Sequence, residues 1–134
     1  MEWNESFATG IKEIDDQHKE IFKEVGWLLD ACRHGKGQEK IGDMVRFLGE
    51  YVSKHFWMEE TLQQINDFPL YQEHKAMHAE FTRDFTKLRE EFEEKGATLN
   101  FIHRINTLVI DWLVHHITRE DKKIAEFIKN KKAA

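Results

Sequence analysis

Two pairs of potential metal ligands are spaced four residues apart near the middle of the chain, His55 with Glu59 and His74 with His78. Residues four apart lie one turn above each other on the same face of an α-helix, so each pair could hold a metal ion from a single helix. The segment 63–69 between them breaks the helical pattern and ends in the only proline, a residue that helix interiors exclude. We therefore expect the chain to turn back here, with the two pairs facing each other across antiparallel helices.

Two further histidines, His18 and His116, lie on the apolar faces of two other predicted helices. A lone histidine on such a face is more often a hydrogen-bonded core residue than a ligand. With His55, His74 and His78, these make five histidines on the apolar faces of four helices. A shared role is then favoured, because each imidazole has two nitrogens to satisfy and burying it without partners is costly. Coordination of one nitrogen and hydrogen bonding of the other removes that cost. Five imidazoles and nearby carboxylates offer too many donors for one tetrahedral zinc, so two metal ions are expected.

The other polar residues near these pairs are interpreted as surface groups. His103 lies one position off the apolar stripe and is expected to be solvated, and His115 is expected to be exposed or to support a ligand. Of two adjacent glutamates, only Glu59 is four residues from His55, so Glu60 is assigned to solvent.

Four long amphipathic helices must position these side chains. Hydrophobic residues recur at spacings of three and four, as on the buried faces of helices. The predicted helices cover about residues 15–34, 38–64, 69–95 and 98–130. Residues 1–14 mix aromatic, aliphatic and polar side chains and predict an irregular N-terminal arm. The expected fold is all-α, an up-down-up-down antiparallel four-helix bundle that forms a single domain over residues 1–134.

The composition agrees with a helical protein and restricts its partners. Of 134 residues, 40% are hydrophobic and 34% charged, with one proline, a balance that favours long helices. The net charge of −5 gives no electrostatic footprint for nucleic acid or an anionic membrane. Cys32 is the only cysteine, and neither a signal peptide nor a long apolar run is present, so we expect a cytoplasmic protein.

Four stretches of the chain together resemble the bacterial hemerythrins and the wider hemerythrin-like domain family. They are Asp-Asp-Gln-His at 15–18, His-Phe-Trp-Met-Glu-Glu at 55–60, His-Lys-Ala-Met-His at 74–78 and Trp-Leu-Val-His-His-Ile at 112–117, followed by Asp121. They stand in the family's order and spacing along nearly the whole chain. The resemblance implies a non-haem di-iron centre that binds O2 reversibly, for oxygen storage, delivery, scavenging or sensing.

The resemblance also assigns the ligands. It implies that His74, His78 and His116 bind one iron and that His18 and His55 bind the other. Glu59 and Asp121 would bridge the two Fe ions, together with a hydroxo or oxo group.

One of these assignments conflicts with ideal helical geometry. His116 and Asp121 are five residues apart, about 140° around an α-helix, whereas Glu120 would align better with His116. A π-type turn, with its wider hydrogen-bonded ring, is one way to bring Asp121 round to the metals.

Oxygen binding without catalysis is the leading interpretation, and O2 is the expected partner. The alternative is a di-iron oxidase, a peroxidase or an enzyme that handles nitric oxide. Such enzymes need a positioned acid to deliver protons to bound oxygen. Leu113 and Ile117, on either side of His116 in the sequence, are apolar and are predicted to line the O2 pocket. We therefore expect no catalytic residues, and the sequence identifies no protein partner.

Overall fold

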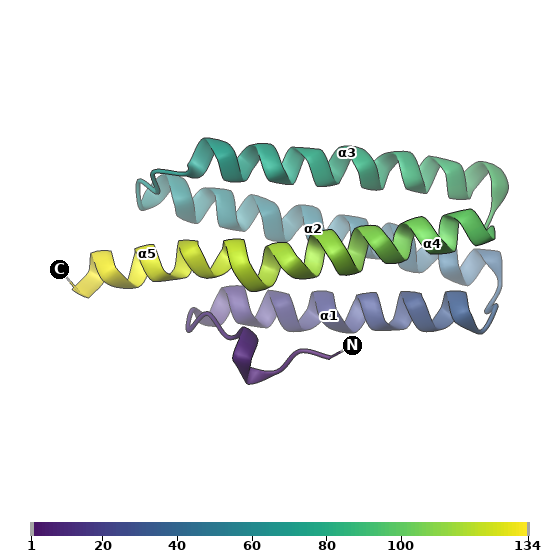
Figure 1. Ribbon diagram of the computed structural model, residues 1–134, viewed down its shortest axis with the longest axis horizontal. Helices are drawn as coiled ribbons and strands as arrows, with labels where there is room; N and C mark the ends of the chain where they lie inside the picture. Colours follow the sequence, from purple (N-terminus) through teal and green to yellow (C-terminus); the bar gives the residue numbers. More distant parts are fainter. Residues whose placement is uncertain (1, 134) are drawn as a thin grey trace.

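Four helical rods lie side by side, and each runs in the opposite direction to the one before it (Figure 1). The computed structural model describes residues 2–133; Met1 and Ala134, the ends of the predicted domain, lie outside the described residues. The first three rods are α1 (Lys12–Arg33), α2 (Gln38–Ile65) and α3 (Tyr71–Lys95). The fourth is α4 (Leu99–Thr107), η2 (Leu108–Val114), η3 (His116–Glu120) and α5 (Asp121–Ala133). With no strand among residues 2–133, the all-α four-helix bundle is confirmed.

The N-terminal arm is tied to α1 by one carboxylate. Asp15 accepts hydrogen bonds from the backbone N–H and the hydroxyl of Thr9, both at 2.8 Å. The helix begins at Lys12, earlier than the expected start near residue 15, and Asp15 holds the arm in place of capping the helix. Because the arm folds back along α1, the Phe7 ring stacks on Phe22 with the centroids 5.4 Å apart (Figure 1).

The reversal between α2 and α3 also differs slightly from expectation. The Pro69 position lies in the turn itself, and α3 begins at Tyr71, whose N–H donates to the Phe68 carbonyl at 3.2 Å. Asp67 adopts a left-handed backbone with φ of 56°, which lets the chain reverse within a few residues. Pro69 is therefore part of the turn and not the first residue of α3.

Most of the core lies between the centre of the bundle and the end that carries the α1–α2 and α3–α4 connections (Figure 1). Leu28, Leu48 and Ile105 are fully buried there, and each such side chain contributes about 1.5–3 kcal/mol through the hydrophobic effect. Gly49 lets α2 and α3 approach closely, since a Cβ atom there would lie 2.8 Å from Cε1 of Phe85. A smaller apolar cluster comprises Phe68, Ile124 and Ile128.

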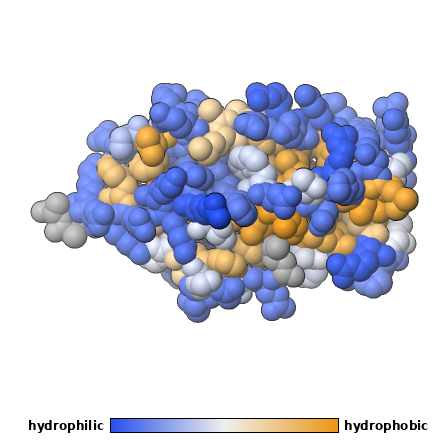
Figure 2. Space-filling model, in the orientation of Figure 1, coloured by the Kyte–Doolittle hydropathy of each residue, from blue (hydrophilic) through white to orange (hydrophobic). Residues whose placement is uncertain are grey.

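Polar side chains cover most of the surface. Figure 2 shows a long face on which hydrophilic residues dominate and hydrophobic residues form separate patches. Within residues 2–133, none of the helices combines the length and the apolar character needed to cross a membrane.

Candidate metal centre

The structure brings all seven sequence-predicted donors together in the interior of the bundle, and all seven are buried. They comprise His18 from α1, His55 and Glu59 from α2, His74 and His78 from α3, and His116 and Asp121 from the fourth rod. Their donor atoms form two overlapping groups. One contains three histidines and the other contains His18 and His55, and both include Glu59 and Asp121.

The three-histidine group has spacings that suit right-angled coordination. Nε2 of His116 lies 3.0 Å from Nε2 of His74 and 3.0 Å from Nε2 of His78. Two nitrogens about 2.1 Å from one metal lie about 3.0 Å apart at a right angle and about 3.4 Å apart at a tetrahedral angle. The two spacings from His116 are therefore closer to right-angled coordination of one metal than to a tetrahedral zinc site.

The two-histidine group is arranged around one carboxylate oxygen. Oδ2 of Asp121 lies 2.7 Å from Nε2 of His18 and 3.2 Å from Nε2 of His55. Oε1 of Glu59 is 3.5 Å from Nε2 of His55. This group offers four donors, one fewer than the five of the three-histidine group.

The two carboxylates connect the groups. Asp121 presents Oδ2 to His18 and His55, while its other oxygen, Oδ1, lies 3.4 Å from Nε2 of both His74 and His116. Oε1 of Glu59 lies between the groups, 3.3 Å from Nε2 of His78 and 3.5 Å from that of His55. A carboxylate with one oxygen toward each group has the arrangement that a bridge between two metals requires.

A π-helical turn places Asp121 in the centre. The backbone N–H of Asp121 donates to the carbonyl of His116, five residues earlier, as the spacing of these two residues requires. Asp121 is fully buried as a result. Glu120, which an ideal α-helix would align with His116, has a side chain 25% exposed and accepts a hydrogen bond from Lys123 at 3.1 Å.

Burial favours the neutral form of His55, His78 and His116. It lowers the pKa of His78 to about 2 and that of His116 to about 4, and neighbouring histidines add to both effects. Burial also lowers the pKa of His55, against the opposing effect of the nearby Asp121 carboxylate. A neutral imidazole keeps a lone pair free on one nitrogen, which is the form that binds a metal.

The two carboxyl groups differ in their charge. Burial, with the nearby charge of Asp121, raises the pKa of Glu59 well above its ordinary value. Burial alone would also raise the pKa of Asp121, but the nearby His116 and the close Nε2 atoms of His18 and His55 hold it well below the usual range. Within the protein alone, only one of the two carboxylates is therefore stabilised as an anion.

Several oxygens in the centre lack any hydrogen-bond partner in the protein. Both side-chain oxygens of Glu59 and Oδ1 of Asp121 are buried and unpartnered. Leaving such a group unsatisfied costs about 1–3 kcal/mol each. A cation between the two groups would satisfy these oxygens, neutralise the carboxylates and use the imidazole lone pairs, so the donor set fits a pair of metal ions.

Two outer partners orient ligand histidines, and the helical pattern did not reveal either. The Nδ1–H of His55 donates to Oε1 of Gln17 at 2.7 Å, and that of His78 donates to Oε2 of Glu60 at 2.9 Å. The assignment of Glu60 to solvent is therefore wrong. It depended on α2 alone, whereas the contact depends on how α2 and α3 are aligned.

Aromatic rings enclose the three-histidine group. Phe56 stacks on His78 with the ring centroids 3.8 Å apart, and Trp112 stacks on His116 at 4.7 Å. Leu113 in η2 and Ile117 in η3 are fully buried in the main apolar cluster.

The two histidines that were interpreted as surface groups lie outside the cluster of seven donors. His103 on α4 is exposed, as expected, and so is His115 between the two π-helical segments.

Comparison with known proteins bears on this centre directly. Residues 9–128 match the family model described as the hemerythrin HHE cation binding domain. A bacteriohemerythrin of Methylococcus capsulatus is 36% identical over 123 residues, which are 91% of this chain and 92% of that protein. A bacteriohemerythrin of Pseudomonas aeruginosa is 30% identical over 96% of this chain and 81% of its own length. The chain belongs to the hemerythrin family.

The relationship extends beyond bacteria. The myohemerythrin of Sipunculus nudus is 31% identical over 121 residues, covering 90% of this chain and 88% of that protein. Membership of the hemerythrin family and the buried cluster of histidines and carboxylates together indicate a non-haem iron site and O2 binding.

Proposed function

We propose that this hemerythrin-family chain holds two irons and binds O2 reversibly, for storage, delivery, scavenging or sensing. The observation that carries the proposal is the division of seven buried donors into two groups that share Glu59 and Asp121. Two irons, bridged by these carboxylates and by a hydroxo or oxo group, would supply the electrons that O2 binding requires.

Each donor has a defined task in this proposal. His74, His78 and His116 hold one iron, and His18 and His55 hold the other. Asp121 serves both, because its two oxygens face different groups. The two anionic bridges offset most of the charge of a buried metal pair, which reduces the cost of removing that charge from water.

The unequal groups suggest where O2 would bind. The two-histidine group has one donor fewer, so its iron keeps an open coordination position. Leu113 and Ile117, which flank His116 in the sequence, are fully buried, so they exclude water and have no proton to donate. An acid is needed to convert bound oxygen into a released product, so apolar walls favour departure of O2 intact over an oxidase or peroxidase reaction.

Optical spectra of the iron-loaded protein test this function. The reduced protein should gain a visible charge-transfer band in air and lose it again under vacuum. Leu113→Ala should admit water and speed conversion to an oxidised form that no longer responds to O2, whereas the exposed His103→Ala should leave that rate unchanged. Continuous consumption of O2 in the presence of a reductant would instead support the enzymatic alternative.

A further inference from the structure

The two outer partners of the centre differ in charge. His78 of the three-histidine group donates its Nδ1–H to the carboxylate of Glu60 at 2.9 Å. His55 of the two-histidine group donates its Nδ1–H to the neutral amide oxygen of Gln17 at 2.7 Å. Among residues 2–133, Glu60 is the only carboxylate that accepts a hydrogen bond from Nδ1 of any of the five clustered histidines.

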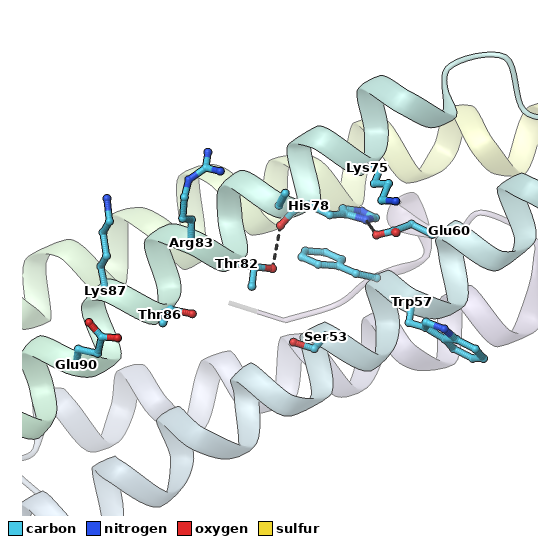
Figure 3. Close-up of a pocket in the computed structure, with 12 residues that line it drawn as sticks. Ser53, Trp57, Glu60, Lys75, His78, Thr82, Arg83, Thr86, Lys87 and Glu90 are labelled. Carbon is cyan, nitrogen blue, oxygen red and sulfur yellow. Dashed lines mark hydrogen bonds and ion pairs between the residues drawn. The ribbon is translucent and has the colours of Figure 1, made fainter.

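Glu60 reaches His78 from a neighbouring helix, across a surface groove. It lies on α2 and its partner lies on α3, so the hydrogen bond joins the two walls of the groove (Figure 3). The groove has a volume of about 700 Å³, and Lys75 lines it on the α3 side. The side chain of Glu60 is 23% exposed, so it is in contact with solvent while it holds a buried ring.

Both outer partners fix the same form of the ring, because a carboxylate or amide oxygen can only accept a hydrogen bond from Nδ1–H. The proton is then on Nδ1, and the lone pair on Nε2 faces the centre in His55 and in His78. The partners differ in how much electron density they add. A carboxylate acceptor raises the basicity of a metal-binding imidazole, and a neutral amide does so less.

We propose that Glu60 is a positioning residue that makes the three-histidine half of the centre the more electron-rich half. The inference rests on the proposed di-iron function and deepens it. The half with the charged outer partner has the full set of donors, and an iron held there would be the easier of the two to oxidise. The half with the open position has only the neutral Gln17, so electron density is directed to the metal that O2 does not reach.

Exchanging the two outer partners tests the proposal. Glu60→Gln retains an oxygen that can accept from His78 but removes the charge, and Gln17→Glu places a charge beside His55. Midpoint potentials of the iron-loaded proteins are measured by spectroscopic titration. The affinity of the metal-free proteins for Zn²⁺ is measured by chelator competition, which reports geometry without a change of oxidation state.

Glu60→Gln should weaken the binding of ferric iron more than that of ferrous iron. If ferric affinity falls tenfold more than ferrous affinity, the midpoint potential rises by about 59 mV for each electron. Gln17→Glu should lower the potential. Zn²⁺ affinity should change less than ferric affinity in both variants. Glu80→Gln removes the same charge from an exposed position on α3, two residues from His78, and should leave the potential as in the wild type.

The outcomes separate this inference from the proposed function. If the wild type binds iron and responds reversibly to O2, but the potential of Glu60→Gln equals that of the wild type or of Glu80→Gln, the role of Glu60 is wrong and the function stands. Equal losses of Zn²⁺ and ferric affinity would show that Glu60 acts through geometry alone, which also overturns the inference. If the wild-type protein binds no iron, both the proposed function and the role of Glu60 are wrong.

Discussion

The interior of this bundle contains two equally buried regions that are completed in different ways. Around Leu28, Leu48 and Ile105 the chain fills its own space with apolar side chains. Around Glu59 and Asp121 it leaves buried oxygens without partners and crowds five imidazoles together. Helical periodicity places both sets of residues inside, except for Asp121, which the π-helical turn brings into the centre. The apolar region is complete within the folded chain, whereas the polar region needs cations to satisfy it.

The largest expected effect is the loss of a histidine that faces the metals. His74→Ala should abolish tight metal binding in the three-histidine group, because two imidazoles would remain where three converge at 3.0 Å spacings. A metal present at 1,000 times its dissociation constant stabilises a protein by about 4 kcal/mol. Thermal unfolding with and without metal should therefore show a large difference for the wild type and little for the variant.

The exposed His103→Ala is the matched control for that comparison. It removes an imidazole of the same kind from α4, outside the centre. Its stabilisation by metal should equal that of the wild type. A His74→Ala protein stabilised as strongly by metal as the wild type would contradict the assignment of that residue.

A core substitution should behave in the opposite way. Leu48→Ala removes a fully buried side chain and should lower the free energy of unfolding by about 2–5 kcal/mol. Because Leu48 belongs to the apolar region, denaturant titrations should give this loss both with and without metal. A loss that appears only in the metal-loaded protein would mean that the two regions are not independent.

A smaller effect is expected where the two carboxylates of the last rod are compared. Asp121→Asn keeps the shape of the side chain and removes the charge shared by the two groups. Outer partners of metal ligands are worth about 10–100-fold in affinity, so a residue inside the centre should cost at least about tenfold. Glu120→Gln, which removes the charge paired with Lys123 outside the centre, should leave metal affinity nearly unchanged. If chelator competition shows a loss of metal affinity for Glu120→Gln and none for Asp121→Asn, Glu120 is the ligand.

An effect of another kind is expected for the metal-free protein at mild acidity, because it accumulates gradually as the pH falls. Well above pH 6.5, His78 and His116 are neutral in both the folded and the unfolded chain. As the pH falls, unfolded chains bind protons that buried His116, with its pKa near 4, and His78, near 2, do not accept. The free energy of unfolding should fall by about 1.4 kcal/mol per pH unit for each of these two residues between pH 6.5 and 4. Stability that stays constant over this range would contradict their burial as neutral groups.

The comparison also explains which features could be predicted from the sequence. Spacings of three and four residues predicted the helices and identified core positions, because one-sided burial is a property of each helix alone. The resemblance supplied Asp121, and its five-residue distance from His116 pointed to the π-helical turn that the structure contains. The second π-helical segment, Leu108–Val114, had no such signal, since no pair of polar residues there required a wider turn.

Features that depend on how two elements are aligned could not be predicted in the same way. Glu60 was separated from the centre by its position on α2, yet the alignment of α2 with α3 brings it to His78. Asp15 looked like a helix start, yet it holds the arm through Thr9. In each case the choice of partner is made by tertiary contacts, which a single helix cannot show.

Metal analysis of the purified, iron-loaded protein tests the central claim most directly. The division of the donors into groups of five and four that share two carboxylates predicts two irons per chain. His74→Ala should bind fewer than two, and the His103→Ala control should bind two. One zinc per chain with no bound iron would contradict the di-iron account.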